Sequence, residues 1–251
     1  MSAYFSEAVF RPTAAADYRE LARLGSDVDV QHKTLWGLFP SPAGTARPFL
    51  YRQRVDDETQ DGNAARFWLL SNALPEAPDV RWRIRSKPYS PIFREGQRLR
   101  FELRVAPSVT RIDPRQAVKP GKRVPRSTRF DPVAVALAAL PAQERAIERQ
   151  RWVDGKLGLW LHDKAMRCGF TWGDPDRVCV VRYEAASQER SERENLRFSI
   201  ADFRGELEVT DAAAFTQAAL HGVGHQRSFG CGLLLLRPAR CDDSDDSDDS
   251  D

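Results

Sequence analysis

The sequence lacks both the cysteine pattern of a metal site and any long apolar segment. Its four cysteines, Cys168, Cys179, Cys231 and Cys241, include no CxxC pair, so a zinc site is not expected. No apolar run approaches the about 18 residues that indicate a membrane span, and the N-terminus has no signal-peptide pattern. We therefore expect no metal, no cofactor and no membrane contact, and a location in the reducing cytoplasm.

The formal charge of +2 hides a strongly basic body. Residues 242–251 hold seven aspartates among serines, and without them 38 basic residues stand against 29 acidic ones, a charge of +9. Such a body fits a polyanionic partner, and a generally basic soluble enzyme is the alternative. The tail is too polar and self-repelling to fold. We favour a disordered solubilising end over a mimic of phosphate that competes for the basic surface.

The first half alternates between strand and helix patterns. A break at residues 25–27 separates two expected helices, and Ser26 or Asp27 is expected to cap the second. The expected strands are 3–10, 47–55, 65–71 and 80–86, and the expected helices are 14–24, 28–38 and a single turn within 75–79. The order β-α-β-β-(short α)-β is that of a ferredoxin-like module.

The second half repeats this arrangement. Strands are expected at 97–107, 177–184, 195–203 and 233–236, with 205–209 continuing the third, and helices at 133–150, 156–167 and 211–221. A basic segment spans 111–129, and 185–194 is expected to be a mixed-charge loop. The predicted fold class is α+β, with two tandem ferredoxin-like (RRM-like) modules and antiparallel sheets. We predict domains at 1–90 and 91–240 and a disordered acidic tail at 241–251.

A glycine-rich segment at 221–232 lies between the last helix and the last strand. Its pattern is GxG, five residues, then GxG, and Arg227 occupies the sixth position of a GxGxxG match. A dinucleotide fingerprint follows a strand and opens a helix, which is the reverse order, so dinucleotide binding is disfavoured. The alternatives are an anion-binding loop, with backbone N–H groups and Arg227 as donors, and a turn that closes a sheet.

His32 lies on a predicted helix, at the rim of an apolar face formed by Leu35, Trp36 and Phe39. Imidazole transfers protons near neutral pH, so His32 is a candidate general acid or base. Taken alone, a partly buried core histidine is the alternative. Lys33 follows directly and is a candidate for electrostatic stabilisation, with a solvated helix lysine as its alternative.

Three segments together resemble a known family. They are His-x-x-Leu-Trp-x-Leu-Phe-Pro at 32–40, Arg-Pro-Phe-Leu-Tyr at 47–51, and the glycine-rich segment followed by leucines. The chain thereby resembles, over about residues 3–239, the CasE-type CRISPR RNA endoribonuclease of type I-E Cascade systems. The resemblance implies tandem ferredoxin-like domains and metal-free cleavage at the base of a repeat hairpin. It implies that His32 is catalytic, and it leaves the second catalytic group open, since Asp29 stands where some members have tyrosine.

The resemblance also implies the chemistry and the partners. The ribose 2′-OH attacks the adjacent phosphate, which gives a 2′,3′-cyclic phosphate and a 5′-OH. This needs a proton acceptor, a proton donor and nearby cations; His32 would be the base or the acid, and Lys33 a stabilising cation. The expected partners are the CRISPR repeat RNA hairpin, kept after cleavage, and other Cascade subunits, especially the one that coats the crRNA backbone.

Basic residues and the glycine-rich segment give the candidate RNA contacts. Arg190 and Arg193 are instead expected to pair with acidic neighbours. The candidates are Arg111, Lys119, Lys122, Arg123, Arg126, Arg129, Arg182, Arg197, Gly224, His225, Arg227 and Ser228. The main alternative function is a structural subunit that binds the RNA hairpin without cutting it. A nucleotide-dependent enzyme is disfavoured because the sequence has no Walker lysine motif.

Overall fold

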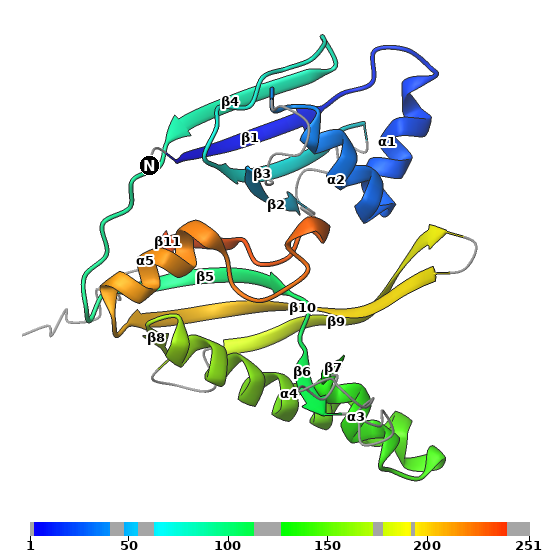
Figure 1. The fold of residues 1–251 in the computed structure, drawn as a ribbon, viewed down its shortest axis with the longest axis vertical. Helices are drawn as coiled ribbons and strands as arrows, with labels where there is room; N and C mark the ends of the chain where they lie inside the picture. The colour runs from blue at the N-terminus through cyan, green and yellow to red at the C-terminus, as the bar shows by residue number, and fades with distance from the viewer. Residues whose placement is uncertain are drawn as a thin grey trace, which may run out of the picture.

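The computed structural model describes residues 3–40, 48–54, 63–112, 127–172, 178–191 and 194–239. Of these, the backbone alone is described at 111–112, 127–128, 185–191 and 194–197. Two large antiparallel sheets form separate layers, joined at one side by the segment that connects β4 (Trp82–Pro88) to β5 (Arg98–Val105) (Figure 1). The fold is therefore α+β, as predicted.

The first sheet confirms the four strands predicted for the first half. Its strands are β1 (Tyr4–Phe10), β2 (Phe49–Arg54), β3 (Ala65–Ser71) and β4. They lie in the order β2-β3-β1-β4, and every neighbouring pair is antiparallel. This is the ferredoxin-like arrangement, in which the first and third strands are central and the fourth returns beside the first.

Two helices, α1 (Asp17–Ser26) and α2 (Val28–Trp36), precede β2. The predicted break is confirmed, but it falls at Asp27 alone, since α1 continues through residues 25 and 26. The Asp27 carboxylate accepts hydrogen bonds from the backbone N–H groups of Asp29 at 2.9 Å and Val30 at 3.1 Å. It therefore caps α2, because those N–H groups have no partner inside the helix.

One face of the first sheet packs against these helices. Alternate strand residues point to that face, and each fully buried leucine or phenylalanine there contributes about 1.5–3 kcal/mol. The buried set includes Ala8, Phe10, Tyr51, Phe67 and Leu69 from the strands and Leu24, Leu35 and Leu38 from the helical segment. Core packing thus fixes α2 against β2.

The helical turn predicted within 75–79 is wrong. Residues 74–77 have no regular structure, and the Glu76 N–H donates to the carbonyl of Leu38 at 2.8 Å. Pro75 and Pro78 lack amide donors, so this short segment gains little from helix formation. The segment runs instead beside Leu38, just after the end of α2.

The second module repeats the topology. Its strands are β5, β8 (Phe170–Thr171), β9 (Val178–Ser191), β10 (Glu194–Val209) and β11 (Leu234–Pro238), and its helices are α3 (Pro132–Ala138), α4 (Ala142–Arg167) and α5 (Ala212–His221). The order is β11-β5-β10-β8, with β9 also paired to β10. A separate two-stranded ribbon joins β6 (Val109–Ile112) to β7 (Ser127–Phe130), at the two ends of the predicted basic segment.

The loop predicted at 185–194 is wrong, because β9 and β10 continue through it as a long hairpin. Backbone pairing reaches Ser191 opposite Glu194, and the hairpin projects away from the rest of the module (Figure 1). A projecting ribbon has no core to face, so it needs no apolar alternation. The charged sequence of this segment therefore carries no alternating pattern from which the strand pair could be predicted.

The helices predicted at 133–150 and 156–167 are divided differently. Asp131 caps the short α3, and α4 then runs unbroken from Ala142, past Gly155 and Gly158, to Arg167. Each glycine costs about 1 kcal/mol in a helix. Buried residues on α4, among them Val153, Leu157 and Leu161, offset that cost by packing on the sheet.

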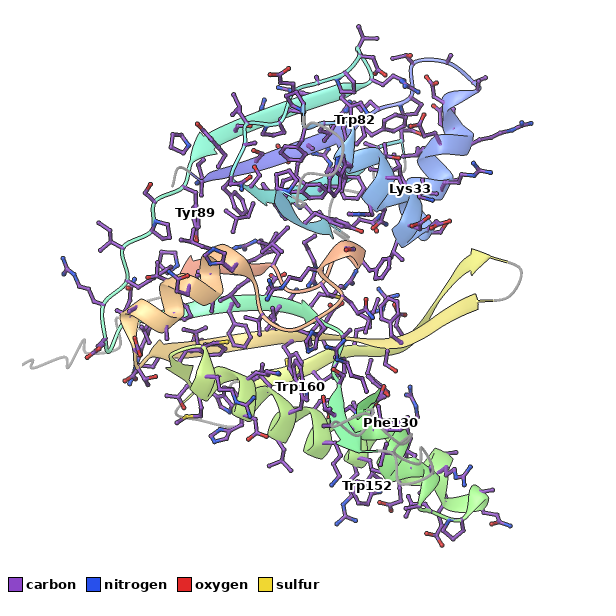
Figure 2. All side chains as sticks on the ribbon, in the orientation of Figure 1. Lys33, Trp82, Tyr89, Phe130, Trp152 and Trp160 are labelled. Carbon is purple, nitrogen blue, oxygen red and sulfur yellow. The ribbon has the colours of Figure 1, made fainter. Side chains whose placement is uncertain are left out.

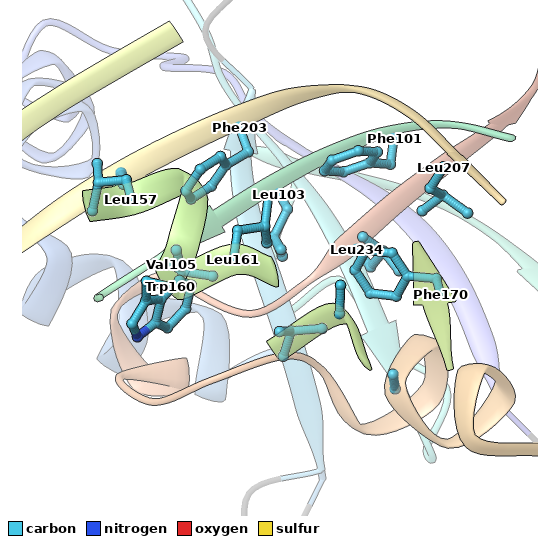
Figure 3. Packing of buried hydrophobic residues seen from close by; sticks show 14 of the residues in the cluster. Phe101, Leu103, Val105, Leu157, Trp160, Leu161, Phe170, Phe203, Leu207 and Leu234 are labelled. Carbon is cyan, nitrogen blue, oxygen red and sulfur yellow. The ribbon is translucent and has the colours of Figure 1, made fainter. Parts of the chain in front are cut away.

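The core of the second module lies on one face of its sheet. Figure 3 shows side chains of β5, β10 and β11 meeting those of α4. Trp160 stacks on Phe203, with ring centroids 6.5 Å apart. Phe215 of α5 packs edge-on against Phe170 at 5.7 Å, which ties α5 into the same core.

The opposite face of β5 and β10 carries a ladder of cross-strand ion pairs. The pairs are Arg98–Glu208 at 3.5 Å, Arg100–Glu206 at 3.2 Å, Glu102–Arg204 at 3.7 Å and Arg104–Asp202 at 2.7 Å. Each pair joins residues directly opposite in the strand register. Four basic and four acidic groups thus neutralise one another on this face.

The two modules meet where β2 and β3 approach the segment that leads into β11. Leu50, Leu70 and Leu233 form a buried apolar cluster between them. Beside it, Arg52 of the first module lies 3.3 Å from the Asp202 carboxylate, which also pairs with Arg104. The domain boundaries at 1–90 and 91–240 stay a prediction, and the tail at 241–251 lies outside the described residues.

Along the described ranges, no helix is long and apolar enough to span a membrane. No group of three His, Cys, Asp or Glu side chains in the same ranges could hold a metal ion.

Candidate RNA-cleavage site

His32 lies in the middle of α2, half-buried at the edge of an aromatic cluster. Its ring meets Trp36 edge-on, with centroids 5.6 Å apart, and lies 6.0 Å from the ring of Phe49 on β2. Phe49 in turn stacks on Phe39 at 4.9 Å. These aromatic neighbours restrict the orientation of the imidazole while leaving part of it exposed, as a proton-transfer group requires.

Lys33 lies on the exposed side of α2, where Figure 2 labels it. Its ammonium group pairs with the Asp29 carboxylate at 2.5 Å, one helical turn earlier. The hydrogen bond to Asp29, and then the charge of that carboxylate, raise the pKa of Lys33, which stays charged at neutral pH. The structure thus pairs Asp29, the residue at the family's tyrosine position, with Lys33.

The glycine-rich segment forms a tight loop between α5 and β11. Gly222, Gly224, Gly230 and Gly232 all have φ between 73° and 91°, a region that other residues avoid. A Cβ on Gly222 would lie 2.8 Å from Leu50 and 2.9 Å from the carbonyl of Gly232. The loop therefore closes the sheet and needs glycine where its two ends approach.

Arg227 holds this loop together from inside. Its Nε donates to the carbonyl of Gly224 at 3.2 Å and its Nη2 to that of Gly222 at 3.1 Å. A short 3-10 helix, η2 (Arg227–Phe229), follows. The guanidinium thus serves the loop's own structure, and its contact with RNA stays a prediction.

The loop also contacts the helix that carries His32. The Tyr51 hydroxyl lies 3.2 Å from the carbonyl of Val28 in α2 and 3.3 Å from the carbonyl of Ser228 in η2. The contact of Tyr51 with Ser228 spans 177 positions of the chain, so the two candidate segments are neighbours in the fold. The structure brings the region of His32 together with that of Ser228.

Three basic side chains act electrostatically on His225 of this loop. Burial lowers the pKa of His225, and the charges of Arg129, Lys164 and Arg227 lower it further. We call these four residues the cation cluster. Lys164 comes from α4, where its ammonium lies 5.7 Å from the ring of Trp160. Lys164 was not among the RNA contacts predicted from the sequence. Its spacing from Trp160 indicates that the two side chains share one face of the helix, but the sequence does not show which part of the protein that face contacts.

The other predicted RNA contacts are less closely defined. Arg182 is exposed on β9 and pairs with Glu184 at 2.6 Å. The side chains of Arg111 and Arg197, and all of Lys119, Lys122, Arg123 and Arg126, lie outside the described residues. Their roles stay predictions.

Comparison with known proteins gives the family. A model described as "CRISPR associated protein" matches residues 3–238, nearly the whole chain. The chain belongs to the CRISPR associated protein family. The match includes α2, β2 and the glycine-rich loop, the segments that carried the resemblance in the sequence.

Two curated members of this CRISPR family are similar in sequence. One, the CRISPR system Cascade subunit CasE of Escherichia coli (strain K12), is 26% identical over 207 residues, 82% of this chain and 90% of the relative. The other, the CRISPR-associated endoribonuclease Cse3 of Thermus thermophilus, is 29% identical over 154 residues, 61% of each chain. They confirm the resemblance to the CasE type.

A solved structure confirms the fold. CRISPR endoribonuclease Cse3 bound to 19-nucleotide RNA superposes with a TM-score of 0.66 at 20% identity, covering 95% of this chain and 100% of that one. The tandem ferredoxin-like arrangement is therefore shared across almost the whole length.

Proposed function

We propose that this chain is a metal-independent endoribonuclease that cleaves precursor CRISPR RNA at the base of the repeat hairpin. The observation that carries the proposal is the contact between the His32 helix and the glycine-rich loop of the second module. Names of relatives support it, since one is an endoribonuclease and another a Cascade subunit. We further propose that the product stays bound within a Cascade effector complex.

The chemistry is an internal transfer at phosphorus. The ribose 2′-oxygen forms a bond to the adjacent phosphorus, and the bond from phosphorus to the 5′-oxygen breaks. One proton leaves the 2′-OH and another reaches the departing 5′-oxygen, which gives a 2′,3′-cyclic phosphate and a 5′-OH. His32 supplies one of these two transfers, and Lys33 adds positive charge near the phosphorane.

The cation cluster and the loop would hold the RNA backbone. Three of its side chains are permanently charged near neutral pH, and a bound phosphate would favour the charged form of His225 as well. The face of β5 and β10 is a poorer candidate, because its arginines are already paired with carboxylates. RNA binding should therefore weaken steeply as salt is added.

A structural subunit that binds the hairpin without cutting it is the second candidate function. The observation in its favour is at position 29, where a carboxylate paired with Lys33 stands in place of a phenol. Some members of the family have a tyrosine at this position, and an aspartate cannot replace its phenol hydroxyl as a proton donor. The two candidates share the binding surface and differ only in the chemical step.

The deciding experiment incubates the protein with its repeat hairpin RNA in EDTA and analyses the product ends. We expect a 2′,3′-cyclic phosphate and a 5′-OH. His32→Ala should slow cleavage by about 10²–10⁴-fold and leave RNA affinity nearly unchanged. His162→Ala is the matched control, since His162 is exposed and also meets a tryptophan edge-on, at 5.8 Å. Cleavage by His32→Ala at the wild-type rate would remove His32 from the mechanism, and intact RNA with wild-type protein would favour the structural subunit.

A further inference from the structure

Strand β2 carries a tyrosine that belongs to the segment at 47–51 but has no role in the chemistry above. Tyr51 is fully buried, and its ring contacts those of Phe49 at 6.1 Å and Phe67 at 6.3 Å. A buried tyrosine usually directs its hydroxyl to a defined acceptor. Among the described residues, its hydroxyl lies near acceptors of both modules.

The first acceptor, the carbonyl of Val28, lies 3.2 Å away. In an α-helix, the carbonyl of residue 28 also accepts the backbone N–H of residue 32, which is His32. Tyr51 therefore holds the peptide group that fixes the backbone of the candidate catalytic residue. Phe49, two residues earlier on β2, packs beside the imidazole ring itself.

The second acceptor, the carbonyl of Ser228, lies 3.3 Å away in η2. The loop reaches the tyrosine ring only because a glycine follows: a Cβ on Gly230 would lie 3.2 Å from Tyr51 Cε2. A single hydroxyl proton is thus shared between the His32 helix and the loop that contains Ser228. On the opposite face of β2, Arg52 pairs with Asp202, which joins the same strand to the second module again.

We propose that Tyr51 is a positioning residue for RNA cleavage, which sets the distance between His32 and a phosphate held at the glycine-rich loop. This inference rests on the proposed function. It differs from a purely structural role, in which the hydroxyl would stabilise the fold without affecting the reaction rate. A displacement of about 1 Å between reacting groups can cost about 10²-fold in rate, so one tether between modules is sufficient to matter.

The test is Tyr51→Phe, which removes one oxygen and keeps the ring. Cleavage is measured in a single turnover, with full-length protein in saturating excess over repeat hairpin RNA, below the unfolding temperature. Under these conditions the rate constant reports the chemical step, and circular dichroism of the same samples reports the folded fraction. Tyr183→Phe is the matched control, because the Tyr183 hydroxyl donates at 2.7 Å to Asp131 within the second module.

We expect Tyr51→Phe to lower the rate constant by about tenfold, with RNA affinity unchanged within about twofold. Tyr183→Phe should keep the wild-type rate constant. A Tyr51→Phe protein that is less folded by circular dichroism but keeps the wild-type rate constant would overturn the inference, as would equal losses of rate constant in both variants. If wild-type protein did not cleave at all, the proposed function would fail first, and the two failures are thus distinguishable.

Discussion

Neutralising Asp202 should destabilise the protein more than any other conservative change between the modules. The Asp202 side chain is only 11% exposed, and its carboxylate accepts hydrogen bonds from Nε of Arg104 at 2.8 Å and Nη2 of Arg104 at 2.7 Å. It also forms an ion pair with Nη2 of Arg52 at 3.3 Å. Asp202→Asn keeps the shape of the side chain and removes its charge. Two buried guanidinium groups would then face one neutral amide.

The magnitude follows from the burial of the partners. Arg104 and Arg52 are 13% and 12% exposed, so neither can recover full hydration without rearrangement. Removing one partner from a buried ion pair lowers the free energy of unfolding by about 3–5 kcal/mol. We expect about 3 kcal/mol for Asp202→Asn, because the amide oxygen of asparagine can still accept a hydrogen bond. Arg52→Met should cost about 1 kcal/mol or less. Burial already lowers the pKa of Arg52, against the effect of Asp202, and among the described residues its Nη1 has no hydrogen-bond partner.

Urea unfolding at pH 7 measures both variants. With an m-value of about 3 kcal/mol/M, Asp202→Asn should move the midpoint down by about 1 M and Arg52→Met by about 0.3 M or less. Equal midpoints for the two variants would refute this account of the cluster.

The pH dependence gives a second measurement on Asp202. Burial alone would raise its pKa, but the hydrogen bond from Arg104 and the charges of Arg52 and Arg104 outweigh burial and lower it. The stabilisation is therefore complete above the unfolded pKa of about 3.9 and is lost as pH falls through the lower folded value. The gap between wild type and Asp202→Asn should close in that acidic range, and a gap that widened there would contradict the assignment.

Two further predictions concern the loop and its surroundings. Lys164→Ala should weaken RNA binding and reduce the slope of log affinity against log salt by about 1, in titrations at several salt concentrations; Lys156→Ala, on the same helix, should leave the slope unchanged. Gly222→Ala should cost about 2 kcal/mol, seen as a lower melting temperature, because φ is +81° and the new Cβ would lie 2.9 Å from a backbone oxygen. An unchanged melting temperature would mean that the loop ends are not as close as described.

Much of the sheet structure could be predicted from local sequence. Alternation at 98–105 predicts a strand because it has one face on a core and one face of charged side chains, a period of two that survives in the sequence. Where that condition fails, prediction fails too. The projecting end of the β9–β10 hairpin has no core to face, and α4 crosses Gly155 and Gly158 because distant contacts with the sheet outweigh local propensity.

The candidate site divides in the same way. His32 and the glycine-rich segment could be found, since residue type and spacing mark them locally. Their contact through Tyr51 could not, because it joins positions 51 and 228, which only the assembled modules bring together. The inward turn of Arg227 and the place of Lys164 in the cation cluster depend on the same long-range packing.

The ladder between β5 and β10 has a consequence for how the chain finds its fold. A slip of one residue would send each side chain to the wrong face of the sheet. A slip of two keeps the faces but, in either direction, places two like-charged pairs opposite each other: Arg100 against Arg204 and Glu102 against Asp202, or Glu102 against Glu206 and Arg104 against Arg204. Like charges directly opposite are destabilising. The charge order along these two strands thus encodes a single alignment, and misaligned pairings of β5 with β10 are disfavoured before the core closes.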